Sequence, residues 1–191
     1  MKTRQTLLQK IKANHDDRSW EDFVYYYRAY VLMLIKGMGL DHHTAEDISQ
    51  QVMIKTWKKL PDFDYNPKRC LFRTWLSRVV KNTVLDYLKS KAGRMNNASV
   101  ELNDFEEIIQ PDIEKLADQE WKTYITDLAW SNVRPHFKDN VIETFLELRK
   151  GGEINAIAGK MGIQENTVYV YRKRVENALA KEIVRLDKEL S

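Results

Sequence analysis

Two clusters of side chains in this sequence have types and spacing suited to binding nucleic acid. In the first, Trp75, Arg78 and Asn82 recur at intervals of three and four residues, so they share one face of a helix. A tryptophan can stack on an unpaired base, an asparagine can hydrogen-bond to it, and an arginine can neutralise its phosphate. This combination is typical of proteins that hold single strands. A tryptophan that covers a neighbouring helix, beside a solvated charged face, is an equally open alternative.

The second cluster lies near the carboxyl end, where the spacing is typical of a helix-turn-helix. Ala158 is the small residue at a close helix crossing, Gly162 follows four positions later in the turn, and Val168 is the buried aliphatic residue of the second helix. A glycine suits the turn because it adopts positive φ at little cost. An ordinary helical hairpin is the alternative, but the basic run at 172–174 favours DNA binding.

The second helix of this motif should have one buried and one exposed face. The residues expected to be buried are Val168, Tyr171, Val175 and Leu179. The residues on the opposite side, which could enter a major groove, are Asn166, Thr167, Tyr169, Lys173 and Arg174. Asparagine and arginine can hydrogen-bond to base edges, whereas lysine mainly neutralises phosphate. We therefore expect this helix to read duplex DNA.

The helix around Asp47 is apolar on two sides. One stripe, suited to the core, consists of Ala45, Ile48, Val52 and Thr56. The opposite stripe mixes a carboxylate, amides and large apolar groups and consists of Asp47, Gln50, Gln51, Met53, Ile54 and Trp57. Protein interfaces have this mixed character. A helix sandwiched within its own core is the alternative, and the pattern alone does not decide between the two.

The remaining polar residues do not form a recognisable site for catalysis or for a metal or other cofactor. The cluster Asp41, His42, His43, Glu46 and Asp47 stands at a helix start, where capping is the favoured interpretation. The single cysteine, Cys70, excludes an internal disulfide and fits a reducing cytoplasm. No phosphate-binding loop, dinucleotide fingerprint or nucleophile elbow is present, and no apolar run is long enough to cross a membrane. We expect no enzyme activity, no cofactor and no membrane insertion.

The sequence predicts an all-α fold of two small helical domains joined by a flexible acidic linker. The predicted helices cover about 20–35, 44–60, 69–91, 113–130, 141–148, 153–161 and 164–190, with Pro61 and Gly93 ending the second and the third. The predicted divisions are a first domain at 1–94, a linker at 95–112 and a helix-turn-helix domain at 113–191. Charge supports this division, because 55–94 holds eleven Lys or Arg against three Asp, and 95–120 holds eight acidic residues against one Lys.

Three segments resemble extracytoplasmic-function sigma factors of bacterial RNA polymerase. The run 45–52, AEDISQQV, is similar to the polymerase-binding signature of sigma region 2. The run 72–76, FRTWL, with Asn82 and 86–88, DYL, resembles the part of that region that binds the minus-ten element. The segment 153–179 resembles region 4, which reads the minus-thirty-five element. Gln51 departs from the family, which usually has Glu there, and Tyr169 and Tyr171 stand where basic residues are common.

The resemblance implies three sets of binding residues. The set that would bind the polymerase is Asp47, Gln50, Gln51, Met53 and Trp57. The set that would bind the melted minus-ten element, beside a loop at 62–69 that would capture a flipped base, is Lys68, Arg69, Arg73, Trp75, Arg78, Asn82 and Lys89. The set that would bind the minus-thirty-five element is Asn166, Thr167, Tyr169, Lys173 and Arg174.

The resemblance implies core RNA polymerase and promoter DNA as partners, in the cytoplasm, and it allows an anti-sigma factor as a third. The main alternative is a stand-alone helix-turn-helix regulator with an effector or dimerisation domain. That alternative leaves the second stripe around Asp47 unexplained. A helical adaptor that binds only protein is a further alternative, and the basic stripes argue against it.

Overall fold

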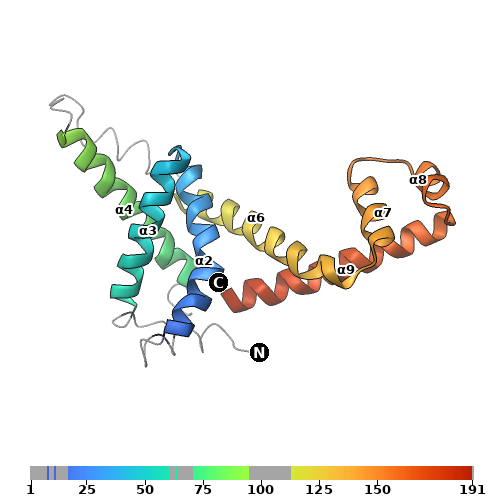
Figure 1. Cartoon of the computed structure of the whole chain (residues 1–191), viewed down its shortest axis with the longest axis horizontal. Coiled ribbons are helices and arrows are strands. Elements are labelled where there is room, and N and C mark those ends of the chain that lie inside the picture. The colour runs from blue at the N-terminus through green and yellow to red at the C-terminus, as the bar shows by residue number, and fades with distance from the viewer. Residues whose placement is uncertain are drawn as a thin grey trace. The chain divides into compact units, whose positions relative to one another are not determined.

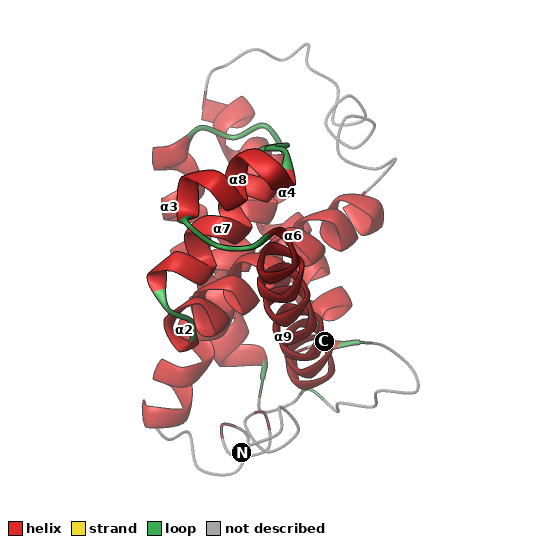
Figure 2. Cartoon of the chain, turned by 90° about the vertical axis from the view of Figure 1, so that its right-hand side faces the viewer, coloured by secondary structure: helices red, strands yellow, loops and turns green. Residues whose placement is uncertain are grey.

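A computed structural model describes residues 8, 11, 17–60, 63, 71–94 and 113–190. Within these ranges the regular structure is helical throughout and contains no strand, which confirms the predicted all-α class (Figure 2). The helices are α2 (Asp17–Gly37), α3 (His42–Lys59), α4 (Phe72–Arg94), α6 (Ile113–Val133), the 3-10 turn η1 (Arg134–His136), α7 (Asp139–Arg149), α8 (Ile154–Met161) and α9 (Glu165–Leu190).

The chain forms two compact units. Unit 1 comprises Met1–Tyr124 with Glu189–Ser191, and unit 2 comprises Ile125–Lys188. The division falls within α6, whereas the sequence places the start of the second domain at 113. The predicted linker at 95–112 lies outside the described residues. The functional domain limits therefore stay a prediction, and each unit is described by itself.

Unit 1 is built on α2, α3 and α4, with α3 packed against both of the others (Figure 1). The core contains the apolar faces that the helical periodicity predicts. Its fully buried members include Phe23, Tyr27, Val31, Leu34, Ala45, Ile48, Val52, Phe72, Leu76 and Val80. Because one side of each helix is used for this core, the opposite sides of α3 and α4 remain available for partners.

The start of α3 follows the predicted capping. The Thr44 backbone N–H donates to Oδ1 of Asp41 at 3.1 Å, and the Thr44 hydroxyl donates to Oδ2 at 2.7 Å. These hydrogen bonds lower the pKa of Asp41, because they favour its charged form. Gly39, with φ of 85°, makes the turn between α2 and α3. Together they fix where α3 begins, and so which side chains its outer face carries.

The limits of α4 differ from the prediction. The helix begins at Phe72 rather than near residue 69, and it continues through Gly93 to Arg94. Gly93 therefore lies inside the helix and does not act as its terminator. A glycine lowers helix stability by up to about 1 kcal/mol relative to alanine, and a helix can tolerate that cost. The prediction that Gly93 ends this helix is wrong.

The first half of α6 packs into unit 1. Trp121 is 1% exposed, and its ring centroid lies 5.0 Å from that of Tyr30 on α2. The Tyr30 hydroxyl donates to the Ala117 carbonyl at 3.4 Å, and the Tyr124 hydroxyl donates to the Tyr26 carbonyl. Burial raises the pKa of both Tyr30 and Tyr124, so both phenols stay protonated and able to donate.

Unit 2 contains the predicted helix-turn-helix, formed by α8 and α9 with α7 packed beside them. Gly162 ends α8 in the left-handed conformation, with φ of 64° and ψ of 34°. The next backbone N–H, that of Ile163, donates to the Ala158 carbonyl at 3.0 Å and closes the turn. Ala158 and Val168 are buried in one cluster with Ile157. The small residue, the turn glycine and the aliphatic residue thus have the positions expected from their spacing.

Candidate nucleic-acid and protein interfaces

The outer face of α3 is accessible. Asp47, Gln50 and Gln51 are exposed, and Ile54 is 56% exposed. The opposite stripe, Ala45, Ile48, Val52 and Thr56, is buried. The alternative of a helix buried on both sides is therefore wrong for these four outer residues. What remains is a surface that combines one carboxylate, two amides and one large apolar group.

Two members of the predicted stripe on α3 lie differently. Met53 is only 7% exposed, because it follows buried Ser49 by four residues and precedes buried Thr56 by three, so it lies on the same side of the helix as they do. The expectation that Met53 shares the exposed face is wrong. Trp57 is half-buried, and its ring centroid lies 4.8 Å from that of Trp20, in an edge-on arrangement. The Trp57 indole is therefore partly used to hold α3 against α2.

One face of α4 carries four of the residues predicted to bind single-stranded DNA. Trp75, Arg78, Asn82 and Lys89 are separated by three, four and seven residues, so they follow one line along the helix. Arg78, Asn82 and Lys89 are exposed. Trp75 is half-buried, and its ring centroid lies 4.4 Å from that of Phe63 and 5.3 Å from that of Phe72.

The contact of Phe63 with Trp75 was not predicted from the sequence. Phe63 lies in the predicted loop after Pro61. The only indication of its contact with Trp75 in the sequence is that residue 63 is aromatic. Apart from Phe63, the base-capture loop at 62–69, which includes Lys68 and Arg69, lies outside the described residues. The part of the face that is described therefore consists of a tryptophan supported by two phenylalanines, followed by a row of polar and basic side chains.

Arg73 does not lie with the other residues of this set. It precedes Trp75 by two positions, and such side chains point to nearly opposite sides of a helix. Its Nη2 lies 3.3 Å from Oδ1 of Asp118, and its guanidinium carbon lies 5.6 Å from the ring centroid of Trp121. Its Nε is buried, with no hydrogen-bond partner among the described residues. The resemblance implies that Arg73 binds the minus-ten element together with Trp75, but its side chain packs against α6 and does not share the face of Trp75.

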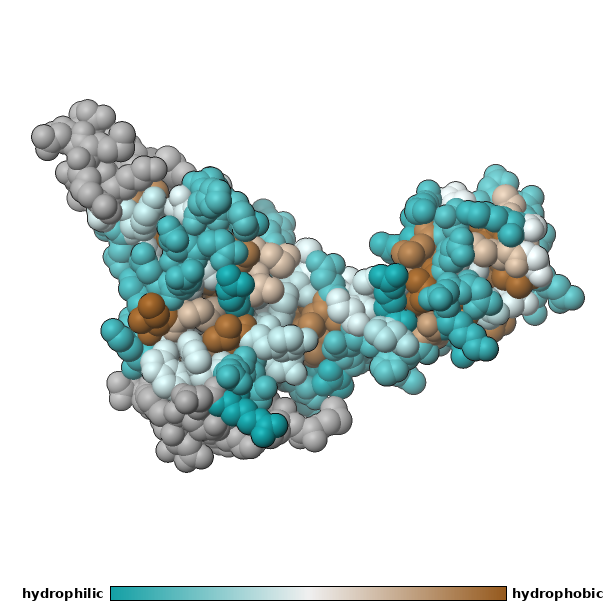
Figure 3. Space-filling model, in the orientation of Figure 1, coloured by the Kyte–Doolittle hydropathy of each residue, from teal (hydrophilic) through white to brown (hydrophobic). Residues whose placement is uncertain are grey.

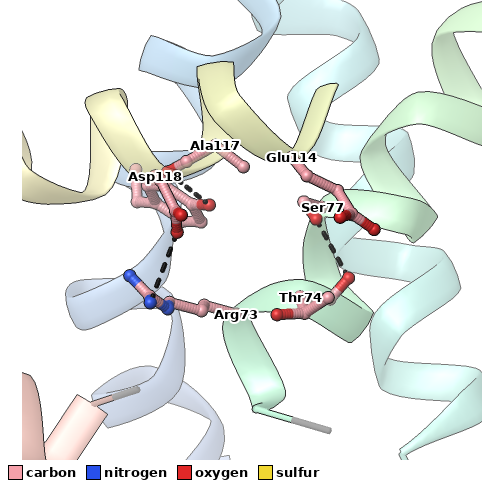
Figure 4. A pocket seen from close by; sticks show the side chains of 7 residues that line it. Arg73, Thr74, Ser77, Glu114, Ala117 and Asp118 are labelled. Atoms are coloured by element: carbon pink, nitrogen blue, oxygen red, sulfur yellow. Dashed lines mark hydrogen bonds and ion pairs between the residues drawn. The ribbon is translucent and has the colours of Figure 1, made fainter. Parts of the chain in front are cut away.

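A pocket of about 160 Å³ lies between α4 and α6, beside Arg73 (Figure 4). Its lining is polar and comes from Tyr30, Arg73, Thr74, Ser77, Glu114, Ala117 and Asp118. The Ser77 hydroxyl donates to the Thr74 carbonyl at 2.9 Å within α4. Glu114 also lies 3.8 Å from Arg78, but both side chains are more than half exposed, so this pair adds little stability. The packing of α6 beside α4 was not predicted from the sequence.

The outer face of α9 has the character predicted for a DNA-reading helix. Asn166, Lys173 and Arg174 are exposed, Tyr169 is 52% exposed, and Thr167 is half-buried. The expected inner residues Val168 and Val175 are fully buried, and Tyr171 and Leu179 pack against the core cluster of Val175. The predicted division of this helix into two faces is therefore confirmed.

The basic residues of α9 are not equivalent. Arg172 Nε donates to Oε1 of Glu176 at 2.8 Å, one turn along the same helix, and this pairing raises the pKa of Arg172. Neither Lys173 nor Arg174 has an ion-pair partner within the part of the chain that the structure describes. Lys173 and Arg174 are thus the members of the basic run whose charge is available to a ligand.

Other potential sites are not supported. No group of three or more His, Cys, Asp or Glu residues suited to a metal ion occurs among the described residues. In the histidine-rich start of α3, Asp41 caps the helix and Glu46 pairs with Arg28 of α2. None of the described helices is long and apolar enough to cross a membrane. Figure 3 shows hydrophilic side chains over most of the visible surface, with apolar ones in small separate patches.

Comparison with known proteins finds a family match over α3, α4 and most of α2. Residues 23–94 match the family described as Sigma-70 region 2. Over 84 residues the chain is 31% identical to the ECF RNA polymerase sigma factor SigW of Bacillus subtilis, covering 44% of this chain and 43% of that protein. Over 102 residues it is 28% identical to the RNA polymerase sigma-H factor of Pseudomonas aeruginosa, covering 53% and 51%. Each match spans about half the length of the relative.

Proposed function

We propose that this chain acts as a sigma factor in transcription initiation, because residues 23–94 match the sigma-70 region 2 family and because the chain is similar to two sigma factors, one of which is an ECF sigma factor. The observation that carries the proposal is that the same chain holds this region and a second unit with a helix-turn-helix, in which Gly162 forms the turn. In the proposed role the chain binds core RNA polymerase, recognises two promoter elements and promotes strand opening. The role includes no catalytic step by the chain itself.

Polymerase binding is assigned to the outer face of α3. Asp47, Gln50 and Gln51 supply an exposed carboxylate and two amides, and Ile54 supplies an exposed apolar side chain one turn further along the same face. Interfaces combine an apolar centre with a polar rim in this way. Trp57, at the end of the same face, would contribute the part of its ring that Trp20 leaves exposed.

Capture of the melted minus-ten strand is assigned to the line Trp75, Arg78, Asn82 and Lys89 on α4. Flipping a base out of a duplex costs on the order of a few kcal/mol. Stacking of an unpaired base on an aromatic ring returns ~1–3 kcal/mol. Phe63 and Phe72 pack against Trp75 and hold its ring in place, so little side-chain freedom is lost when a base stacks there.

Recognition of the minus-thirty-five element is assigned to the outer face of α9. Asn166 and Arg174 would hydrogen-bond to base edges in the major groove, and Lys173 would neutralise phosphate. Thr167 and Tyr169 flank these residues and complete the contact surface. The proposed partners are core RNA polymerase and promoter DNA. An anti-sigma factor is the proposed regulator of access to them, and the cytoplasm is the proposed location.

In vitro transcription with core polymerase and a randomised promoter library tests this function. The chain should direct initiation from a subset of templates that share two elements, and core polymerase without it should not. A variant with Asp47→Ala, Gln50→Ala and Ile54→Ala should lose this activity while its melting temperature stays that of the parent. If the free chain alone gives a tight, sequence-specific footprint on duplex DNA and adds nothing to the polymerase, it is a stand-alone regulator instead.

A further inference from the structure

An apolar side chain lies in the middle of the otherwise polar outer face of α9. Val170 is 46% exposed, although the core-facing residues Val168 and Val175 of the same helix are fully buried. It follows Asn166 by one helical turn and precedes Arg174 by one turn, and both of these are exposed. Its neighbour Tyr169 is also exposed, at 52%. The polar face thus contains an apolar strip between its two candidate base readers.

Packing does not explain a valine at this position. Val168 and Val175 belong to two buried core clusters on the inner side of α9, and residue 170 lies on the other side of the helix. Valine has a lower helix propensity than alanine or the long polar residues, because its branched side chain loses rotamer freedom. Its exposed methyl groups therefore gain their stabilising contacts only when something covers them.

The major groove of DNA offers one apolar feature, the C5-methyl group of thymine. We propose that Val170 contacts a thymine methyl at a base pair between the one read by Asn166 and the one read by Arg174. This inference rests on the proposed function, since it takes α9 to be the helix that reads the upstream element. It adds the residue that would distinguish thymine from cytosine at the centre of that element, which hydrogen-bonding residues on either side cannot do.

Replacing thymine by deoxyuridine tests the contact, because it removes the methyl group and keeps base pairing. The preferred upstream element is first selected with holoenzyme made from the full chain, and Asn166→Ala and Arg174→Ala locate the two outer base pairs. Each thymine is then replaced singly. Binding of the parent holoenzyme should weaken about fourfold at a base pair between these two, the equivalent of ~0.8 kcal/mol for one buried methyl group.

The variant Val170→Ala completes a double-mutant cycle with this replacement. It should bind the thymine template about fourfold more weakly than the parent does, and it should not distinguish thymine from deoxyuridine. Alanine favours the helix, so α9 should keep its structure. Val184→Ala is the matched control, since Val184 is an exposed valine, 69% accessible, further along the same helix. That control should behave as the parent on both templates.

Three results would overturn the inference alone. The first is a selected element without thymine between the outer base pairs. The second is a Val170→Ala variant as sensitive to deoxyuridine as the parent, and the third is a parent whose binding is not weakened by deoxyuridine between the outer base pairs. If Asn166→Ala and Arg174→Ala leave every upstream preference unchanged, the assignment of α9 as the reading helix fails, and the inference fails with it. Suppose that Asn166→Ala and Arg174→Ala relax the preference at the outer base pairs, but deoxyuridine at the central base pair does not weaken binding of the parent. Only the role of Val170 would then be refuted.

Discussion

At the scale of single residues, Trp75 is the side chain whose role most needs separating from its packing. Its ring is half-buried against Phe63 and Phe72, yet it begins the exposed line formed by Arg78 and Asn82. A ring held in this way can be a core residue or a prearranged surface for a base. The two roles can be distinguished with promoter DNA that is already melted. If Trp75 binds a base, a melted template should partly restore the activity that is lost when its ring is removed, and if Trp75 only packs, it should not.

We expect Trp75→Ala and Asn82→Ala to slow open-complex formation on duplex promoters and to leave closed-duplex affinity unchanged. For Trp75 the loss should be ~1–3 kcal/mol, the value of one base–aromatic stack. Templates melted in advance at the minus-ten element should restore part of the rate. Tyr25→Ala, which removes an aromatic ring 69% exposed on α2, is the control and should open promoters normally. Absence of rescue on melted templates would identify Trp75 as a packing residue.

Alanine substitutions of the adjacent residues Arg172, Lys173 and Arg174 on α9 should affect promoter binding in different ways. Arg174→Ala should relax preference at one or two upstream base pairs by ~1–3 kcal/mol. Lys173→Ala should weaken all promoters alike and lower the slope of log affinity against log salt by about 0.9, the effect of one lost phosphate contact. Arg172→Ala, which removes a cation already paired with Glu176, should change both quantities least. The idea is refuted if all three variants match the parent across a salt titration.

At the scale of elements, the turn between α8 and α9 provides a matched pair of glycines. An added Cβ would meet no atom within 4 Å at either Gly159 or Gly162, but only Gly162 has positive φ. Gly162→Ala should therefore lower the free energy of unfolding by ~1–2 kcal/mol through backbone strain alone. Gly159→Ala, inside α8, should raise it by about 0.5–1 kcal/mol. Urea denaturation of both variants measures this, and equal shifts would mean that the turn is not left-handed.

The elements also indicate how far the sequence could predict this structure. Periodicity identified the inner faces of α3 and α9, and local rules identified the Asp41 cap and the Gly162 turn, because these depend on residues close together in the chain. Periodicity does not say which distant element covers a face. For that reason the packing of Trp121 on Tyr30 and the turn of Arg73 toward Asp118 were missed.

At the scale of the whole molecule, the division within α6 predicts that unit 1 and unit 2 can be destabilised independently of each other. Trp121→Ala should destabilise unit 1 by ~3–5 kcal/mol, because it empties a fully buried site. Hydrogen exchange should then speed up in α2 and remain slow in α7 to α9. Trp130→Ala is the reciprocal control, since Trp130 stacks on Phe145 in unit 2 with centroids 5.8 Å apart. Equal acceleration throughout the chain after either substitution would show that the units unfold together.

The distribution of the indole rings has a spectroscopic consequence. Of the five tryptophans, Trp20, Trp57, Trp75 and Trp121 belong to unit 1, and only Trp130 belongs to unit 2. Tryptophan emission during denaturation is therefore dominated by unit 1, because unfolding of unit 2 changes the surroundings of only one ring of the five. Far-ultraviolet circular dichroism weights both units by their helical length. If the units unfold independently, the midpoints from emission and from dichroism should separate, and the gap between them would measure the difference in stability.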